Sequence, residues 1–197
     1  MVSDFITPVL VLLAYTVPLW ILSRIIINFL KKRKINKPTL KLELILFLFY
    51  LYLVLVISLT ILPLPFARFQ WPNKGHINLI PIVTTIKDIK DIFSSQKAII
   101  TDYTIENILG NILLFFPLGV FLPVLSKKYH SVKKVMVFAI ICSSSIEISQ
   151  LISRLYEIYR FVDIDDVILN TTGAVLGFLS TKKWVVNNIP KKLQSDL

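Results

Sequence analysis

Long apolar segments alternate with short basic ones along the chain. Crossing about 30 Å of hydrocarbon takes a helix of roughly 20 residues. Five apolar blocks approach this length, and they are Phe5–Leu30, Leu42–Leu64, Ile105–Leu125, Val135–Ile152 and Val167–Ser180. The last block reaches it if the helix begins at Ile164 and continues into Lys182. The pattern predicts an all-α fold, a polytopic membrane helix bundle of about five transmembrane helices.

The loop between the second and third blocks, Pro65–Thr104, contains a weaker helical pattern. Starting at Pro81, apolar residues recur at helical spacing, with charged residues between them, at Ile82, Ile86, Ile89 and Phe93. Proline suits the first turn of a helix. We expect an amphipathic helix lying on the outer surface of the bilayer. A helix packed as a lid over the bundle is the alternative.

Basic residues predict how the bundle is oriented. They cluster in Lys31–Lys41, in Lys127–Lys134 and in a C-terminal tail beginning at Lys182. Short loops rich in Lys and Arg stay on the cytoplasmic side. With five spans, all three clusters become cytoplasmic if the N-terminus is outside and the C-terminus inside. The loops Pro65–Thr104 and Ser153–Asp165 then face outward.

Composition agrees with a membrane class and excludes several others. Of the 197 residues, 55% are hydrophobic and only 17% are charged, whereas a soluble domain carries about 25% charged residues. The net charge of +10 comes mostly from the clusters between apolar blocks, so no nucleic-acid partner is expected. The single cysteine, Cys142, excludes a disulfide within the chain and a CxxC metal site.

Three predicted spans carry polar residues at helical spacing. The third has Asn107 and Asn111 on one face, four residues apart. The fourth and fifth carry longer series, which are Ser143, Glu147, Gln150 and Arg154, and then Asp163, Asp166 and Asn170. Polar residues within spans face the bundle interior or a water-filled cavity, so each is a functional candidate. In the predicted orientation all three sets lie near the outer leaflet.

Each of these residues also has a structural interpretation. Asn and Gln side chains form hydrogen bonds between helices in membrane bundles, and Gly173 with Gly177 forms a GxxxG packing motif. Asp163 and Asp165 fit solvated loop charges or helix N-caps. A charged Glu147 requires a cation, such as Arg154 or Arg160; a protonated, neutral Glu147 is the alternative.

The remaining chemistry is left open by the sequence. An EF-hand is excluded because Val167 or Ile168 stands where its glycine belongs. His76 and His130 fall on opposite sides of the membrane and cannot share a zinc ion. Oxygen ligands from Asp163, Asp166 and Glu147 suit a divalent cation, but acid–base chemistry by the same carboxyls is equally compatible. We therefore assign no metal and no cofactor.

Three ordered sequence blocks resemble the VanZ-like membrane protein family. They are NLIP (Asn78–Pro81), NILLFFPLGVFLP (Asn111–Pro123), and EISQ (Glu147–Gln150) followed by R-x-x-D-x-x-D-V-x-x-N-T-x-G-x-x-x-G from Arg160 to Gly177. The resemblance covers about Ile77 to Phe178 and implies a VanZ-like domain at 77–180. The apolar and basic pattern adds an N-terminal two-helix membrane region at 1–76 and a basic cytoplasmic tail at 181–197.

The resemblance also implies a function at the bacterial cytoplasmic membrane. Named family members confer resistance to teicoplanin-type lipoglycopeptides, so the expected partner is such an antibiotic or a lipid-linked envelope component, together with membrane lipid. Glu147, Asp166 and Arg160 are the expected reactive groups. The expected ligand-binding residues are Asn107, Asn111, Gln150, Asp163 and Asn170. An enzyme acting on an outer-leaflet lipid or envelope intermediate is the alternative, and a small transporter or scaffold is a third.

Overall fold

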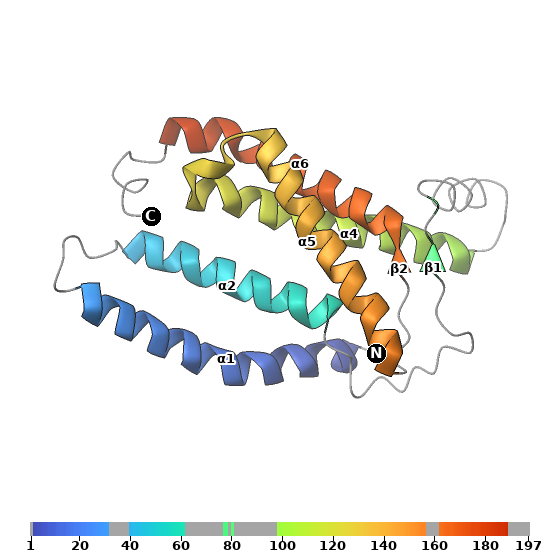
Figure 1. Ribbon diagram of the computed structural model, residues 1–197, viewed down its shortest axis with the longest axis horizontal. Coiled ribbons are helices and arrows are strands. Elements are labelled where there is room, and N and C mark those ends of the chain that lie inside the picture. Colours follow the sequence, from blue (N-terminus) through green and yellow to red (C-terminus); the bar gives the residue numbers. More distant parts are fainter. Residues whose placement is uncertain are drawn as a thin grey trace. The chain divides into compact units, whose positions relative to one another are not determined.

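The computed structural model describes residues 2–31, 40–61, 77–78, 80, 98–156 and 162–188. Within these ranges the chain is helical apart from two short strands and the connecting turns (Figure 1). The elements in chain order are α1 (Val2–Lys31), α2 (Leu40–Thr60), β1 (Ile77–Asn78), α4 (Ala98–Leu125), η1 (Lys127–Tyr129), α5 (Val132–Ser153), η2 (Arg154–Tyr156), β2 (Val162–Asp163) and α6 (Ile164–Asn188).

Each of the five apolar blocks coincides with one of these α-helices, which confirms the predicted all-α membrane fold. Four helices are long and apolar enough to cross a membrane, over Val9–Ile27, Leu40–Thr60, Ile105–Leu125 and Val132–Tyr156. In the described residues α6 does not reach that apolarity, because Asp165 and Asp166 occupy its first turn. The amphipathic helix expected from Pro81 lies outside the described residues, and the orientation stays a prediction.

The chain divides into two compact units, Met1–Gln70 with Pro190–Leu197, and Trp71–Ile189. In the first unit α1 and α2 form a hairpin. The Arg24 guanidinium donates from Nε and Nη2 to the two Glu43 carboxylate oxygens, at 2.8 and 2.6 Å. Trp20 packs against the rings of Phe47 and Tyr50. A fork-to-fork ion pair and an aromatic cluster thus hold the two helices together.

In the second unit α4 and α6 lie side by side, and α5 crosses α6 (Figure 1). Glycines permit the close approach of α4 and α6. A Cβ atom on Gly173 or Gly177 would overlap the backbone carbonyl oxygen of Ile112 or Phe116, and Gly119 meets α6 in the same way. Small residues at such contacts let helix backbones touch in membranes. The packing expected from the GxxxG spacing is therefore confirmed.

A parallel pairing of β1 with β2 joins the segment before α4 to the segment before α6. Ile77 pairs with Val162, and Asn78 pairs with Asp163. Both strands lie beside the start of α6 (Figure 1). The hydrophobic pattern did not predict this short pairing. It holds Asn78 and Asp163 side by side where α6 begins.

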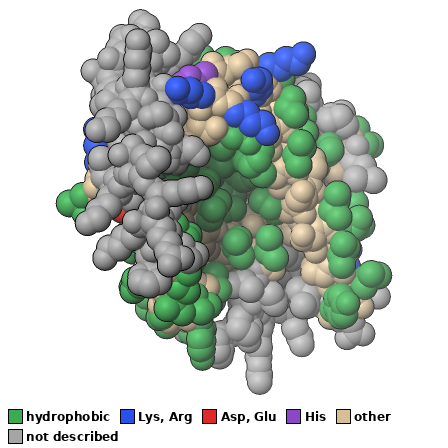
Figure 2. Space-filling view, turned by 60° about the vertical axis from the view of Figure 1, so that its left-hand side comes forward, with side chains coloured by type: hydrophobic (Ala, Val, Ile, Leu, Met, Phe, Trp, Pro, Cys, Tyr) green, Lys and Arg blue, Asp and Glu red, His purple; other side chains and the backbone are tan. Residues whose placement is uncertain are grey.

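The turn between α4 and α5 forms the opposite end of the second unit and is strongly basic. Its exposed cations are Lys127, Lys128, Lys133 and Lys134. The His130 ring donates from Nε2 to the carbonyl oxygen of Pro123 at 3.0 Å, which satisfies a carbonyl in the last turn of α4. Basic side chains gather beside the histidine near the top of the view in Figure 2. The basic cluster and the paired strands thus lie at opposite ends of the helices.

Candidate functional site

The polar series on α5 faces the segment where α6 begins. Glu147 is buried, with 8% of its surface exposed, and its Oε2 accepts a hydrogen bond from the backbone N–H of Asp163 at 3.0 Å. One turn earlier, Ser143 Oγ accepts from Asn170 Nδ2 at 2.9 Å. Residues four apart share one face of a helix. Both contacts therefore join α5 to the β2–α6 segment.

Asp163 lies in β2 and caps α6, so it does not belong to a helical series with Asp166 and Asn170. Its Oδ1 accepts from the Asp165 backbone N–H at 2.9 Å, as an N-cap carboxylate does. The same oxygen accepts from Asn78 Nδ2 at 2.9 Å. Asp165, expected to be a solvated charge or a cap, is instead buried, with 3% of its surface exposed. The spacing predicts Asp163 inside the helix, but α6 begins one residue later, at Ile164.

Asp166 and Asn170 contact different helices. Asp166 Oδ1 accepts from Asn111 Nδ2 on α4 at 2.6 Å, whereas Asn170 reaches Ser143 on α5. Asn111 Nδ2 also lies 3.2 Å from Asn107 Oδ1, so the two α4 amides share a face as their spacing indicates. Because α6 packs against both α4 and α5, its polar residues join all three helices.

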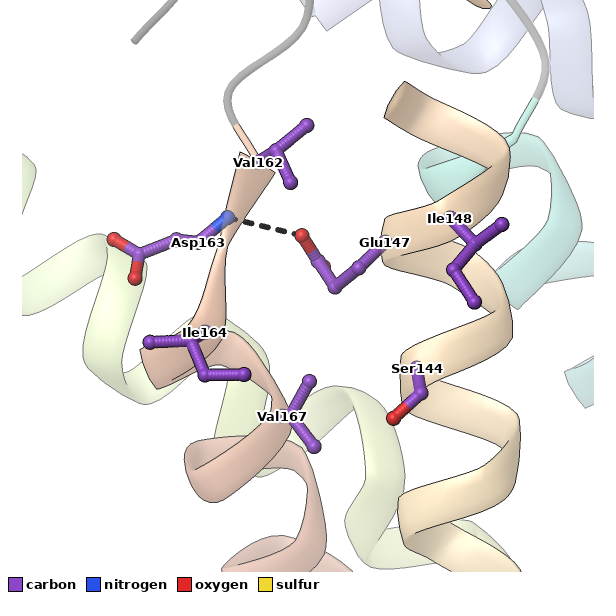
Figure 3. A pocket seen from close by; sticks show the side chains of 7 residues that line it. All are labelled: Ser144, Glu147, Ile148, Val162, Asp163, Ile164 and Val167. Carbon is purple, nitrogen blue, oxygen red and sulfur yellow. Dashed lines mark hydrogen bonds between the residues drawn. The ribbon is translucent and has the colours of Figure 1, made fainter. Parts of the chain in front are cut away.

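A small pocket lies between α5 and the β2–α6 segment (Figure 3). Its volume is about 150 Å³, and its lining residues are Ser144, Glu147, Ile148, Val162, Asp163, Ile164 and Val167. Glu147 points across it toward the Asp163 backbone, while the Asp163 carboxylate points away from the pocket. The described part of the pocket wall therefore presents the Glu147 carboxylate and the Ser144 hydroxyl among aliphatic side chains.

The described acids at the site accept hydrogen bonds from neighbouring amides. Across the described ranges, no group of three or more His, Cys, Asp or Glu side chains is placed to hold a metal ion. Asp163 and Asp166 each accept from an asparagine amide. The site can therefore bind donor groups or accept protons through its carboxylates.

The hydrogen bonds between α4, α5 and α6 connect most of the residues expected at the site, and three others remain to be placed. Gln150, half-buried, follows Glu147 by three residues on α5. Arg154 is in η2 and its side chain is half-buried. Arg160 lies outside the described residues. Among the described residues, the group that donates a hydrogen bond to Glu147 is the backbone N–H of Asp163.

Sequence reasoning missed Asn78, which is buried and joins the site through its side chain. Asn78 Nδ2 donates to Asp163, and its Oδ1 accepts from the Ile80 backbone N–H at 3.1 Å. The available signal was the NLIP block, whose asparagine we had used for the family resemblance alone. An asparagine between two apolar blocks gives no periodicity that would connect it to α6.

Comparison with known proteins supports the resemblance. A model of the VanZ/LLP1 family matches residues 49–186, which include both strands, α4, α5 and all but the last two residues of α6. No curated protein and no solved structure matches the chain. The matched region covers more than half of the sequence and contains the whole polar network. The chain is a multi-pass membrane protein that belongs to the VanZ/LLP1 family.

Proposed function

We propose that this protein protects the bacterial cytoplasmic membrane against teicoplanin-type lipoglycopeptides through the polar site around Glu147 and Asp166. The observation that carries the proposal is the convergence of buried and half-buried acids and amides from α4, α5, β2–α6 and β1 at one end of the second unit. In this proposal the site faces the outer leaflet and binds the antibiotic, or a lipid-linked envelope component, or limits access of the antibiotic to its target.

The cost of these groups argues for a role beyond packing. Acids and amides inside membrane bundles are expensive and mark functional sites by default. Close packing of α4 with α6 is already provided by Gly119, Gly173 and Gly177. The association of α4 with α6 therefore does not depend on the carboxyl group of Asp166 alone.

The pocket suits part of an amphiphile. Teicoplanin carries a fatty acyl tail that anchors it in the membrane, so its polar and apolar groups meet at the bilayer surface. The pocket places the Glu147 carboxylate beside Val162 and Val167. At about 150 Å³ it is smaller than a site for a whole drug-sized ligand, which takes about 300–1,000 Å³. It would hold one group of a larger molecule.

The test is drug susceptibility in a sensitive host that expresses the wild type or a variant. Glu147→Gln and Asp166→Asn keep the side-chain shape and remove the charge. Glu106→Gln is the matched control, because Glu106 is exposed on α4. We expect both site variants to fall to the susceptibility of the empty host toward teicoplanin, while Glu106→Gln protects fully. A glycopeptide without an acyl tail shows whether protection depends on the tail.

Membrane levels of each variant must match the wild type for the comparison to hold. Full protection by both Glu147→Gln and Asp166→Asn at matched levels would refute the proposed site. Equal loss in Glu106→Gln would also refute it, because the effect would not then be specific to Glu147 and Asp166.

A second candidate function is an enzyme that modifies an outer-leaflet lipid or envelope intermediate. The hydrogen bonding of Glu147 favours this candidate. Of its two carboxylate oxygens, Oε2 accepts a hydrogen bond within the described residues and the other does not. The other oxygen remains available as a general base. Mass spectrometry of envelope lipids would show a new species with the wild type and none with Glu147→Gln. Identical lipid profiles would exclude this candidate.

A further inference from the structure

We propose that the pocket beside Glu147 binds a primary ammonium group attached to an aliphatic stem. This inference rests on the proposed function, because it names the ligand chemistry of the same site. It begins from Glu147 itself, which is 8% exposed and lines the pocket. Figure 3 shows its side chain extending from α5 toward the pocket and the β2 backbone.

Charge is the first criterion. No Lys or Arg is among the lining residues of the described pocket, whereas both of its ionisable residues, Glu147 and Asp163, are acids. Asp165 and Asp166 follow directly in the first turn of α6. A buried carboxylate is stabilised by a cation that also donates hydrogen bonds. The site therefore favours a positively charged ligand and disfavours a carboxylate or phosphate.

Hydrogen-bond geometry selects among cations. Glu147 Oε2 already accepts from the Asp163 amide at 3.0 Å. A guanidinium binds best when both carboxylate oxygens are available to its planar fork. An ammonium needs only separate acceptors for its three N–H groups. The second Glu147 oxygen and the Ser144 hydroxyl oxygen provide such acceptors on the pocket wall.

The lining also disfavours a quaternary ammonium. Such cations have no N–H group and are recognised by aromatic cages. Among the lining residues that the structure describes none is aromatic, and the apolar ones are Ile148, Val162, Ile164 and Val167. These branched aliphatic groups suit an alkyl stem. The small volume, about 150 Å³, limits the bound part to the ammonium and a short stem.

The direct test uses n-butylammonium as the probe and the full-length protein in phosphatidylcholine nanodiscs. Saturation-transfer NMR reports its binding, with butyrate and butyltrimethylammonium as matched competitors. We expect n-butylammonium to bind the wild type and Glu106→Gln. We expect Glu147→Gln to bind it more than about tenfold more weakly, because a buried ion pair loses its charge.

The competitors keep the test decisive if Glu147→Gln does not fold, because they need only the wild type. Neither butyrate nor butyltrimethylammonium should displace the probe. Displacement by either at the concentration of n-butylammonium would overturn the proposal. Unchanged binding by a folded Glu147→Gln would overturn it as well.

Two further arms identify the source of the amine. Nanodiscs containing phosphatidylethanolamine should weaken probe binding if the natural ligand is a lipid headgroup. Teicoplanin added to phosphatidylcholine nanodiscs should displace the probe if the antibiotic supplies the amine. Failure of n-butylammonium to bind a protein that still confers resistance would overturn this inference alone. If the wild-type protein confers no resistance to teicoplanin but still binds the amine in a Glu147-dependent way, the proposed function alone would be overturned.

Discussion

Asn111 on α4 donates its side-chain amide to the Asp166 carboxylate on α6 at 2.6 Å, across 55 residues of sequence. The next residue on α4, Ile112, offers the carbonyl oxygen against which Gly173 packs. A polar contact and a steric contact therefore define the same register between the two helices. Changing either should alter how α4 and α6 fit together.

Reversing the Asn111–Asp166 hydrogen bond should be tolerated better than breaking it. Asn111→Asp places two carboxyl groups against each other and removes the donor. We expect it to lower the free energy of unfolding by about 1–3 kcal/mol. Asn111→Asp combined with Asp166→Asn restores one donor and one acceptor in the opposite direction. Thermal unfolding in detergent should show that the double variant regains most of the loss.

The double variant also separates structure from function. It moves the carboxyl group from α6 to α4, so it should fold yet lose protection against teicoplanin. A double variant no more stable than Asn111→Asp alone would show that the two side chains do not interact as a pair.

Gly173 should be intolerant of a methyl group, while Gly110 should accept one. A Cβ on Gly173 would overlap the Ile112 carbonyl oxygen, whereas a Cβ on Gly110 would meet no atom of another described element within 4 Å. We expect Gly173→Ala to destabilise the protein by about 1–3 kcal/mol through overpacking. Gly110→Ala should be neutral or stabilising by up to about 1 kcal/mol, because glycine is costly inside a helix. Equal melting temperatures for the two variants would contradict the close α4–α6 contact.

The outward orientation of the site is testable by cysteine labelling. The native Cys142 is half-buried and is first replaced by alanine. Leu155→Cys lies just after α5, where the native residue is 81% exposed, and Lys128→Cys lies in the basic α4–α5 turn. A membrane-impermeant maleimide should label Leu155→Cys in intact cells and Lys128→Cys only after permeabilisation. The reverse pattern would place the polar site on the cytoplasmic side.

Much of the helical architecture was predictable from the sequence because a helix that crosses the bilayer must be apolar over about 20 consecutive residues. Spanning helices require long apolar runs, and the predicted block Ile105–Leu125 ends at the same residue as α4. The four-residue spacings of Asn107 with Asn111 and of Ser143 with Glu147 correctly predicted shared faces. The family blocks also contain Glu147, Asp163 and Asn170, which the structure brings together between α5 and the β2–α6 segment.

The sequence by itself determined the helices, their polar faces and the glycines that allow close packing, since these depend on neighbours within a few residues. The sequence left Asp163 open between a loop charge and a helix N-cap, and the structure shows a cap that is also paired in β2. Tertiary structure alone decided that Asp166 and Asn170 contact different helices. It also brought Asn78 to Asp163 across 85 residues. Helical periodicity comes from hydrogen bonds between residues four apart, whereas such distant pairs depend on the path of the whole chain.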